Sequence, residues 1–199
     1  MFFSPATLTS LGHVTQLGHR GNEPCPNPSD LFDHMVFDLN GVHRIVIRYC
    51  HCPADPTSHQ MQLVDERWFP ATAFRPSTSF TFRFLDFFQK LQDQSKCTSY
   101  DFYHMIIHCT DNAGLEPDIV SLTRIVSARY ETHASQFRYN EICVVTRLWC
   151  NLKLLKWGGA GHRCGGVEAV QDGDLAVLCP ACPHPGKNTV IQPGRPVYA

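Results

Sequence analysis

The stretch Gly41-Val-His-Arg-Ile-Val-Ile-Arg-Tyr-Cys50-His-Cys52 joins a β-strand pattern directly to a closely spaced pair of cysteines. Its first part is dense in β-branched and aromatic side chains, and Leu39-Asn-Gly41 supplies turn chemistry, so we predict a strand over 42–49. The two thiols at its end can face one point only where the backbone bends, and a bound metal ion would stabilise such a bend. The stretch therefore predicts a strand that ends in a metal site.

A second group of candidate ligands lies upstream, in Leu17-Gly-His19-Arg-Gly-Asn-Glu-Pro-Cys25. Prolines on both sides of Cys25 stiffen this loop, which favours the presentation of a ligand. We predict a tetrahedral site for Zn2+ as cofactor, because loop and strand end together offer enough nitrogen and sulfur ligands. The candidate ligands are His19, Cys25, Cys50 and Cys52, with His43 on the same strand as a fifth.

The composition is that of an ordinary globular protein. The 199 residues are 43% hydrophobic and 18% charged, with a formal net charge of -1, which argues against disorder and against coating nucleic acid along the whole chain. Met1-Phe-Phe-Ser-Pro5 has no cationic segment before its apolar residues, so we expect no secretory signal, and no apolar run is long enough to span a membrane.

The ten cysteines are then expected to sit in a reducing intracellular compartment, as metal ligands and buried thiols rather than disulfides. The alternative is a secreted disulfide domain whose signal lies outside the chain. Cys97, Cys109, Cys143 and Cys150 lack short ligand spacings and are predicted to be buried free thiols. His34 and His51 are predicted to be solvated rather than ligands.

The order of segments predicts an α+β fold. A short strand over 35–37 is expected to pair with 42–49 through the Asn40-Gly41 turn. We divide the chain into a small zinc-stabilised unit of loops and strands (1–75), a helical unit (76–188) and a tail (189–199).

Four later segments carry apolar residues at spacings of three and four, which is typical of amphipathic helices. We predict helices that start at Thr78 or Ser79, at Ser99 and at Pro117, a fourth over about 139–157, and a short C-terminal strand over 175–178.

A second cysteine pair occurs in Cys179-Pro-Ala-Cys182. A redox dithiol needs a helix N-terminus to lower a thiol pKa, and the prolines that follow prevent a helix from starting here. We therefore predict a structural pair. It is either a rigid turn or part of a second metal site with His162, in which Cys164 or His184 takes the remaining place.

Basic residues outnumber acidic ones between 138 and 163. Arg147, Lys153 and Lys156 are candidate contacts to DNA phosphates. A solvated helix face that complements its own C-terminal dipole is the alternative. The glycines at 158–161 follow a helix rather than a strand and no Lys-Ser/Thr follows them, so a phosphate-binding loop is excluded.

Several strings follow one another in a fixed order along nearly the whole chain. They are Leu17-Gly-His19, Gly41-Val-His43, Tyr49-Cys-His-Cys52, Trp68-Phe-Pro-Ala-Thr72, Tyr100-Asp-Phe-Tyr103, Thr110-Asp-Asn-Ala-Gly-Leu115, Leu152-Lys-Leu-Leu-Lys156 and Leu175-Ala-Val-Leu-Cys-Pro-Ala-Cys-Pro-His-Pro-Gly-Lys-Asn188. In this order the chain resembles the CxC-type (CxC2-like) cysteine cluster domain associated with KDZ (Kyakuja–Dileera–Zisupton) transposases of fungal genomes, together with the segment that links this cluster to the catalytic core.

The resemblance implies a zinc-chelating module N-terminal to a DDE-type transposase. By this resemblance, further Cys-x-x-Cys pairs of the family would lie upstream of this chain. The first catalytic carboxylate of the transposase would lie beyond Ala199. Carried over by position, the cluster's ligand pattern falls on His19, Cys25, His43, Cys50 and Cys52. Recurrent positions of the linking segment fall on His162, Cys179 and Cys182.

The function that the resemblance implies is a non-catalytic, nuclear accessory region that contacts DNA or another transposase subunit. No membrane and no small-molecule substrate are expected as partners. The chain alone is expected neither to cut nor to join DNA, because that chemistry needs carboxylates that hold divalent metal ions. The alternative is a degenerate transposon-derived protein-interaction module without DNA binding.

Overall fold

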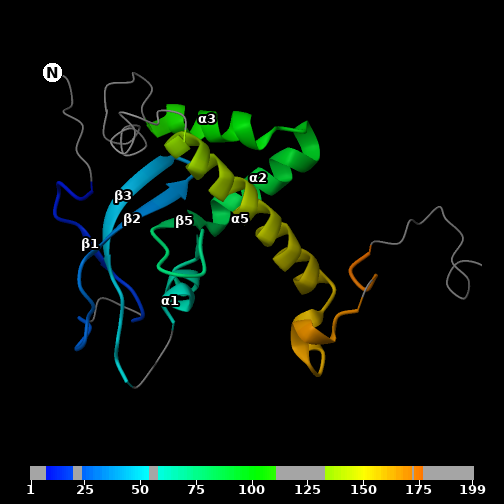
Figure 1. Ribbon diagram of the computed structural model, residues 1–199, viewed down its shortest axis with the longest axis horizontal. Coiled ribbons are helices and arrows are strands. Elements are labelled where there is room, and N and C mark those ends of the chain that lie inside the picture. The colour runs from blue at the N-terminus through cyan, green and yellow to red at the C-terminus, as the bar shows by residue number, and fades with distance from the viewer. Residues whose placement is uncertain (1–7, 20–23, 54–57, 111–132, 172, 177–199) are drawn as a thin grey trace, which may run out of the picture. The chain divides into compact units, whose positions relative to one another are not determined.

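The strands β2 (Phe32–Asp38) and β3 (Gly41–Arg48) form an antiparallel hairpin, as the sequence predicts (Figure 1). Asp38 pairs with Gly41, which leaves Leu39 and Asn40 as a two-residue turn. Gly41 has a φ of +136°, and a Cβ there would lie 2.8 Å from Thr110 Oγ1. The first residue of β3 therefore has to be glycine, both for its positive φ and for the close approach of Thr110 at the end of α3 (Ser99–Thr110).

The computed structural model describes residues 8–19, 24–53, 58–110, 133–171 and 173–176, with the backbone alone over 133–138. Residues of Met1–Cys150 form one compact unit and those of Asn151–Ala199 a second. In the described part of the chain, no helix has the length and apolar character needed to cross a membrane.

A mixed five-stranded sheet of order β1-β3-β2-β5-β4 forms the centre of the first unit. Strand β1 (Val14–Gln16) runs parallel to β3, and β5 (Thr78–Thr81) runs parallel to β2. Strand β4 (Trp68–Pro70) pairs antiparallel with β5 at the edge. Together with the helices this confirms the α+β class. The predicted division at residue 75 falls between β4 and β5, which are neighbours in this sheet.

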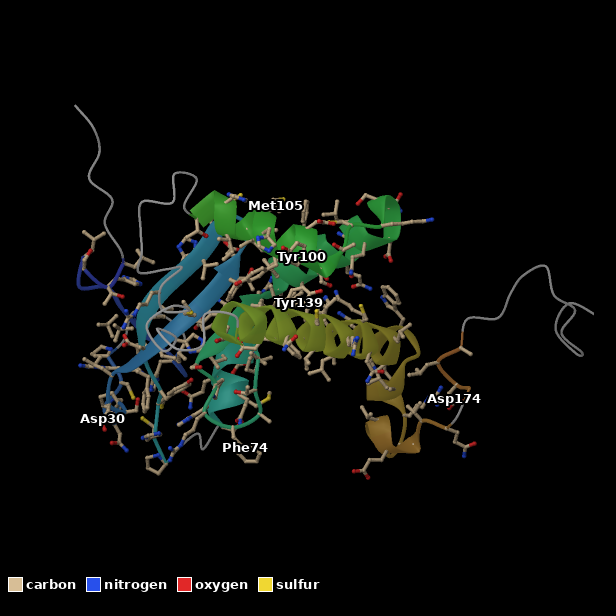
Figure 2. The ribbon with its side chains drawn as sticks, turned by 45° about the horizontal axis from the view of Figure 1, so that its top comes forward. Asp30, Phe74, Tyr100, Met105, Tyr139 and Asp174 are labelled. Atoms are coloured by element: carbon tan, nitrogen blue, oxygen red, sulfur yellow. The ribbon has the colours of Figure 1, made fainter. Side chains whose placement is uncertain are left out.

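Each face of the sheet has its own core, because successive residues of a strand point to opposite faces. On one face, helices α2 (Phe82–Ser95), α3 (Ser99–Thr110) and α5 (His133–Trp157) contribute to a core around Phe37. Tyr100 of α3 and Tyr139 of α5 meet at the rim of this core, with ring centroids 6.0 Å apart (Figure 2).

The opposite core contains Val36 and is covered by the short helix α1 (His59–Asp65) through Leu63. Its other buried members lie in β3 or directly after β1 and β3. They are Leu17, Ile45, Ile47 and Tyr49.

The prediction that a helix starts at Thr78 or Ser79 was wrong. Residues 78–81 form β5, and both side chains are buried in the sheet. The helix begins after Thr81, whose side-chain oxygen accepts a hydrogen bond from the Phe84 N–H at 3.2 Å. Hydroxyl residues suit both a strand and a helix cap, and here pairing with β2 decides between them.

The other predicted elements met different outcomes. The start of α3 at Ser99 and the end of α5 at Trp157 are confirmed, while α5 begins at His133 rather than near 139. The helix predicted from Pro117 lies outside the described residues. Of the strand predicted over 175–178, the two described residues form a turn, in which the Ala176 N–H donates to the Gly173 carbonyl at 3.0 Å.

The prediction of buried thiols on the helices was also wrong. Cys109 is exposed, whereas Cys97, Cys143 and Cys150 are half-buried, and all four are free. His34, predicted to be solvated, is 1% exposed and shares a 2.8 Å hydrogen bond between its Nε2 and Ser79 Oγ. Strand β2 has neighbours on both sides, so a polar side chain of this strand can be buried and satisfied by the next strand.

Asp38 fastens the end of β2 to the start of α2. Its carboxylate accepts hydrogen bonds from Thr81 Oγ1 at 2.7 Å and from Arg83 Nε at 2.6 Å. Burial raises the pKa of the Asp38 carboxyl, but the hydrogen bonds from Arg83 and Thr81 outweigh burial and lower the pKa below its usual range. The stabilisation is therefore present above the unfolded-state pKa of about 3.9 and is lost as the pH falls through the folded-state value.

We expect Asp38→Asn to lower the free energy of unfolding at pH 7 by about 1–2 kcal/mol, because the charge-assisted hydrogen bonds are weakened. The difference from wild type should shrink below about pH 4, because the unfolded state then binds a proton, and it should vanish once the native carboxyl is protonated as well. Urea unfolding at a series of pH values measures both effects. Asp33→Asn is the matched control, since Asp33 pairs with Arg44 at an exposed site and should cost about 0–1 kcal/mol. Equal costs for the two variants would contradict the assignment.

Candidate metal centre

Two parallel strands bring distant parts of the sequence to one edge of the sheet. Strand β1 pairs with β3 up to Gln16 opposite Arg48, and the Leu17 N–H donates to the Arg48 carbonyl at 2.8 Å. Parallel strands deliver the residues that follow them to the same end of the sheet. His19 therefore arrives beside Cys50.

The loop that carries Cys25 is held to the end of β3 by backbone hydrogen bonds. The Ser29 N–H donates to the Tyr49 carbonyl at 2.9 Å, and the His51 N–H donates to the Asn27 carbonyl at 3.0 Å. This short antiparallel pairing runs the loop alongside Cys50 and places Cys25 next to the Cys-x-Cys bend.

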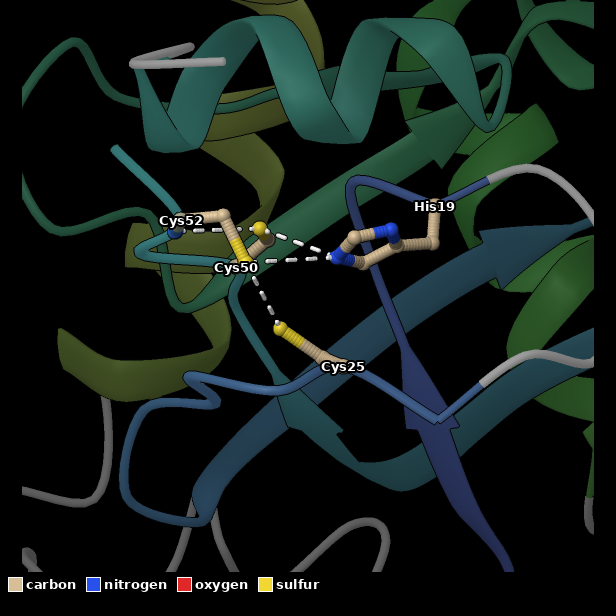
Figure 3. Close-up of side chains that lie close together, drawn as sticks. All are labelled: His19, Cys25, Cys50 and Cys52. Atoms are coloured by element: carbon tan, nitrogen blue, oxygen red, sulfur yellow. Dashed lines mark hydrogen bonds between the residues drawn. The ribbon is translucent and has the colours of Figure 1, made fainter. Parts of the chain in front are cut away.

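One histidine nitrogen and three cysteine sulfurs lie within 4.8 Å of one another (Figure 3). Cys50 Sγ lies 3.2 Å from His19 Nε2, and Cys52 Sγ lies 3.7 Å from the same nitrogen. Cys25 Sγ and Cys52 Sγ are 3.6 Å apart. Cys50 and Cys52 are buried, while His19 and Cys25 are half-buried. These four residues form a site that could hold a metal ion.

The distances suit four ligands around one ion. In a tetrahedron with metal–sulfur bonds of about 2.3 Å and metal–nitrogen bonds of about 2.0–2.1 Å, two sulfurs lie about 3.8 Å apart and a sulfur and a nitrogen about 3.6 Å apart. The three distances above differ from these values by at most about 0.4 Å. The remaining pairs of ligand atoms also lie within 4.8 Å of one another.

The thiols of the cluster differ in acidity. Burial raises the pKa of the Cys25 thiol, but hydrogen bonds from the Asn27 backbone, Cys52, Cys50 and His19 outweigh burial and lower the pKa to about 7. The Cys50 sulfur, together with burial, raises the pKa of Cys52 to about 11. Without a metal, one thiol of the cluster thus ionises readily while its neighbour resists ionisation. A divalent cation would deprotonate the coordinated thiols.

His43, the fifth predicted ligand, is not brought to this cluster. It lies near the start of β3, where its Nε2 shares a 2.9 Å hydrogen bond with Asn40 Oδ1. Cys50 lies seven residue positions further along the chain, most of them in β3, which corresponds to on the order of 23 Å.

The residues predicted for a second metal site are not brought together within the described part of the chain. His162 lies in the 3-10 turn Ala160–His162, and Cys164 is exposed. Cys179, Cys182 and His184 lie outside the described residues. The second site stays a prediction.

The candidate DNA contacts lie on α5. Arg147 and Lys156 are exposed and Lys153 is half-buried. They too stay a prediction.

Two residues that the sequence analysis did not single out surround the cluster. Gln62 of α1 is 1% exposed and bonds to the backbone of Cys50. Gly18 has a φ of +79°, and a Cβ there would lie 2.6 Å from Cys50 Cβ. A glycine directly before His19 in the sequence indicates that another segment packs closely against the backbone there. Gln62 could not be found in this way, because metal-ligand patterns do not include a glutamine on a separate helix.

Comparison with known proteins identifies a related family. A family model described as a CxC2-like cysteine cluster associated with KDZ transposases matches residues 8–114, more than half of the chain. The match includes all four residues of the cluster, the five strands and helices α1 to α3. No curated protein and no solved structure matches the chain.

Proposed function

Because the chain belongs to the family of CxC2-like cysteine clusters associated with KDZ transposases, we propose that it is a zinc-binding accessory region of a KDZ-type transposase. The CxC2 cluster is an accessory domain rather than a catalytic one. In this proposal the DDE-type catalytic core of the transposase lies outside the chain. The observation that carries it is the group of three thiol sulfurs and one histidine nitrogen within 4.8 Å, inside the matched region.

The ligand set favours zinc over other metals. Three cysteines and one histidine are a common set for structural zinc, and thiolates select soft or borderline ions over magnesium and calcium. Four protein ligands leave no coordination position for a substrate or a reactive water, so the ion would have a structural role. The chain purified without chelator is expected to carry about one zinc ion, bound by all four residues of the cluster.

The proposed ion joins three segments that only the sheet brings together. They are the end of β1, the loop around Cys25 and the end of β3. Short loops at the edge of a small sheet bury little apolar surface, so the free energy of metal binding would hold them in place.

The family association supports a nuclear protein that contacts DNA or another transposase subunit. The basic residues Arg147, Lys153 and Lys156 on α5 are the candidate phosphate contacts. The second candidate function is a degenerate transposon-derived module that binds proteins and not DNA, and the near-neutral net charge of -1 favours it.

Reversing two charges on α5 distinguishes the two functions. We expect Lys153→Glu/Lys156→Glu to weaken binding of a DNA duplex. Each phosphate contact that is lost means that fewer counterions are released from the DNA when the protein binds. The slope of log K against log salt should fall in magnitude by about 1.8, which corresponds to about two contacts. Fluorescence anisotropy at several salt concentrations measures this slope.

The control variant is Lys90→Glu/Lys96→Glu, which makes the same charge change at exposed positions of α2 and its cap. If both variants bind DNA equally, or if wild type does not bind, the protein-interaction module is the better account. Magnesium-dependent strand cleavage by this chain alone, abolished by mutation of one of its own aspartates, would contradict the non-catalytic role.

A further inference from the structure

Gln62 pairs with both backbone groups of a candidate metal ligand. Its Oε1 accepts a hydrogen bond from the Cys50 N–H at 2.8 Å, and its Nε2 donates one to the Cys50 carbonyl at 2.9 Å. Two residues opposite each other in an antiparallel sheet exchange the same pair of bonds. The side chain of Gln62 thus takes the place of a neighbouring strand.

The backbone of Cys50 needs such a partner because the sheet ends before it. Strand β3 stops at Arg48, and on one side only the isolated bridge to Pro28 continues the pairing. The bonds of that bridge are made by the neighbouring residues Tyr49 and His51. The N–H and carbonyl of Cys50 therefore belong to the other side, where Gln62 lies. Buried backbone groups without a partner are costly, so this pairing is required for a buried Cys50.

Gly18 packs against this pair from the direction of His19. A Cβ on Gly18 would lie 2.6 Å from Cys50 Cβ and 2.9 Å from Gln62 Oε1. The segment that presents His19 is thus in contact with both members of the pair. The side-chain amide of Gln62 thus holds the backbone N–H and carbonyl of Cys50, and it also contacts the segment that carries His19.

We propose that Gln62 is the positioning residue of the metal centre. By holding the backbone of Cys50 it sets where the Cys50 sulfur lies relative to His19 Nε2, 3.2 Å away. This inference rests on the proposed binding of zinc at the cluster. It adds that helix α1, which supplies no ligand, determines the affinity of the site.

The effect should appear in metal affinity more than in the stability of the metal-free chain. Without metal, the Cys50 segment can shift until water satisfies its N–H and carbonyl. With metal bound, the ion holds the Cys50 sulfur in place together with the other three ligands. The N–H and carbonyl of Cys50 would then stay buried without a hydrogen-bond partner if Gln62 were replaced. Loss of a group that orients a metal ligand usually lowers affinity by about 10–100-fold.

The test compares Gln62→Met, which keeps the side-chain volume and removes both hydrogen bonds, with Gln60→Met. Gln60 is on the same helix, but its amide donates to the Ala73 carbonyl instead. Zinc Kd is measured on the full chain by competition with a chromophoric chelator, and the visible spectrum of the Co2+ form reports ligand geometry. We expect Kd to rise about 10–100-fold with an altered Co2+ spectrum in Gln62→Met, and less than about threefold in Gln60→Met.

Three outcomes would overturn the role of Gln62. They are an unchanged Kd in Gln62→Met, an equal rise in both variants, or a stability loss of the same size with zinc and with excess chelator. Absence of zinc binding by wild type would instead refute the proposed function. If Gln62→Met does not fold, exchange of the Gln62 side-chain amide protons in zinc-loaded wild type decides. Exchange as fast as that of Gln60 would refute the positioning role, and slow exchange would support it.

Discussion

Cys50→Ser is expected to abolish stoichiometric zinc binding and to lower the stability of the zinc-loaded chain by about 4 kcal/mol. The second figure is the stabilisation that a ligand gives at a free concentration about a thousandfold above its Kd. Cys50 Sγ lies 3.2 Å from His19 Nε2, and the N–H of Cys52 donates to it at 3.3 Å. A serine oxygen replaces a soft thiolate ligand poorly, so the variant keeps only the other three ligands of the cluster.

The control for this experiment is Cys109→Ser, because Cys109 is an exposed cysteine of α3 and not a member of the cluster. It should keep the zinc content and the melting temperature of wild type. Elemental analysis and thermal unfolding, with and without chelator, provide the two readouts. Unchanged zinc content in Cys50→Ser would contradict the ligand assignment. In excess chelator the two variants should differ little, because the metal contribution is then absent from both.

Gly18→Ala is expected to cost on the order of 3 kcal/mol and to weaken zinc binding. A residue with a side chain pays about 1–2 kcal/mol in the left-handed region, where Gly18 has a φ of +79°. The new methyl group would also lie 2.6 Å from Cys50 Cβ, and overpacking of this kind costs about 1–3 kcal/mol. The added methyl carbon and Cys50 Cβ are both bonded directly to the backbone, so the backbone of the site must move to separate them.

Gly12 provides a matched control. Its φ is +71°, close to that of Gly18, but a Cβ there would have no atom of the described residues within 4 Å. Gly12→Ala should therefore show the backbone cost alone and leave zinc binding unchanged. Urea unfolding and zinc competition on both variants separate the two contributions. Equal costs would mean that no close contact exists between Gly18 and Cys50.

The sheet hairpin and the four clustered residues could be predicted from local sequence. The strand 42–49 has β-branched density, a tight turn before it and thiols after it, and each of these signals depends on neighbouring residues only. His43 was included because it shares the strand with Cys50. The rise of about 3.3 Å per residue already separates the two, so strand geometry argues against this ligand.

Features that depend on distant contacts could not be predicted. The hydroxyl residues Thr78 and Ser79 suit a helix cap as well as a strand, and only the neighbouring strand β2 makes them part of the sheet. Gln62 is one polar residue of a seven-residue helix, and its role follows only when α1 is placed against Cys50. The exposed Cys109 shows the same limit, since burial of a helix face is decided by what packs against it.

X-ray absorption at the zinc edge, on the full chain purified without chelator, identifies the atoms that surround the metal ion of the cluster. We predict about one zinc ion per chain, surrounded by three sulfurs at about 2.3 Å and one nitrogen at about 2.0–2.1 Å. That shell corresponds to Cys25, Cys50, Cys52 and His19. A chain without zinc, or zinc surrounded by nitrogen and oxygen alone, would contradict this prediction.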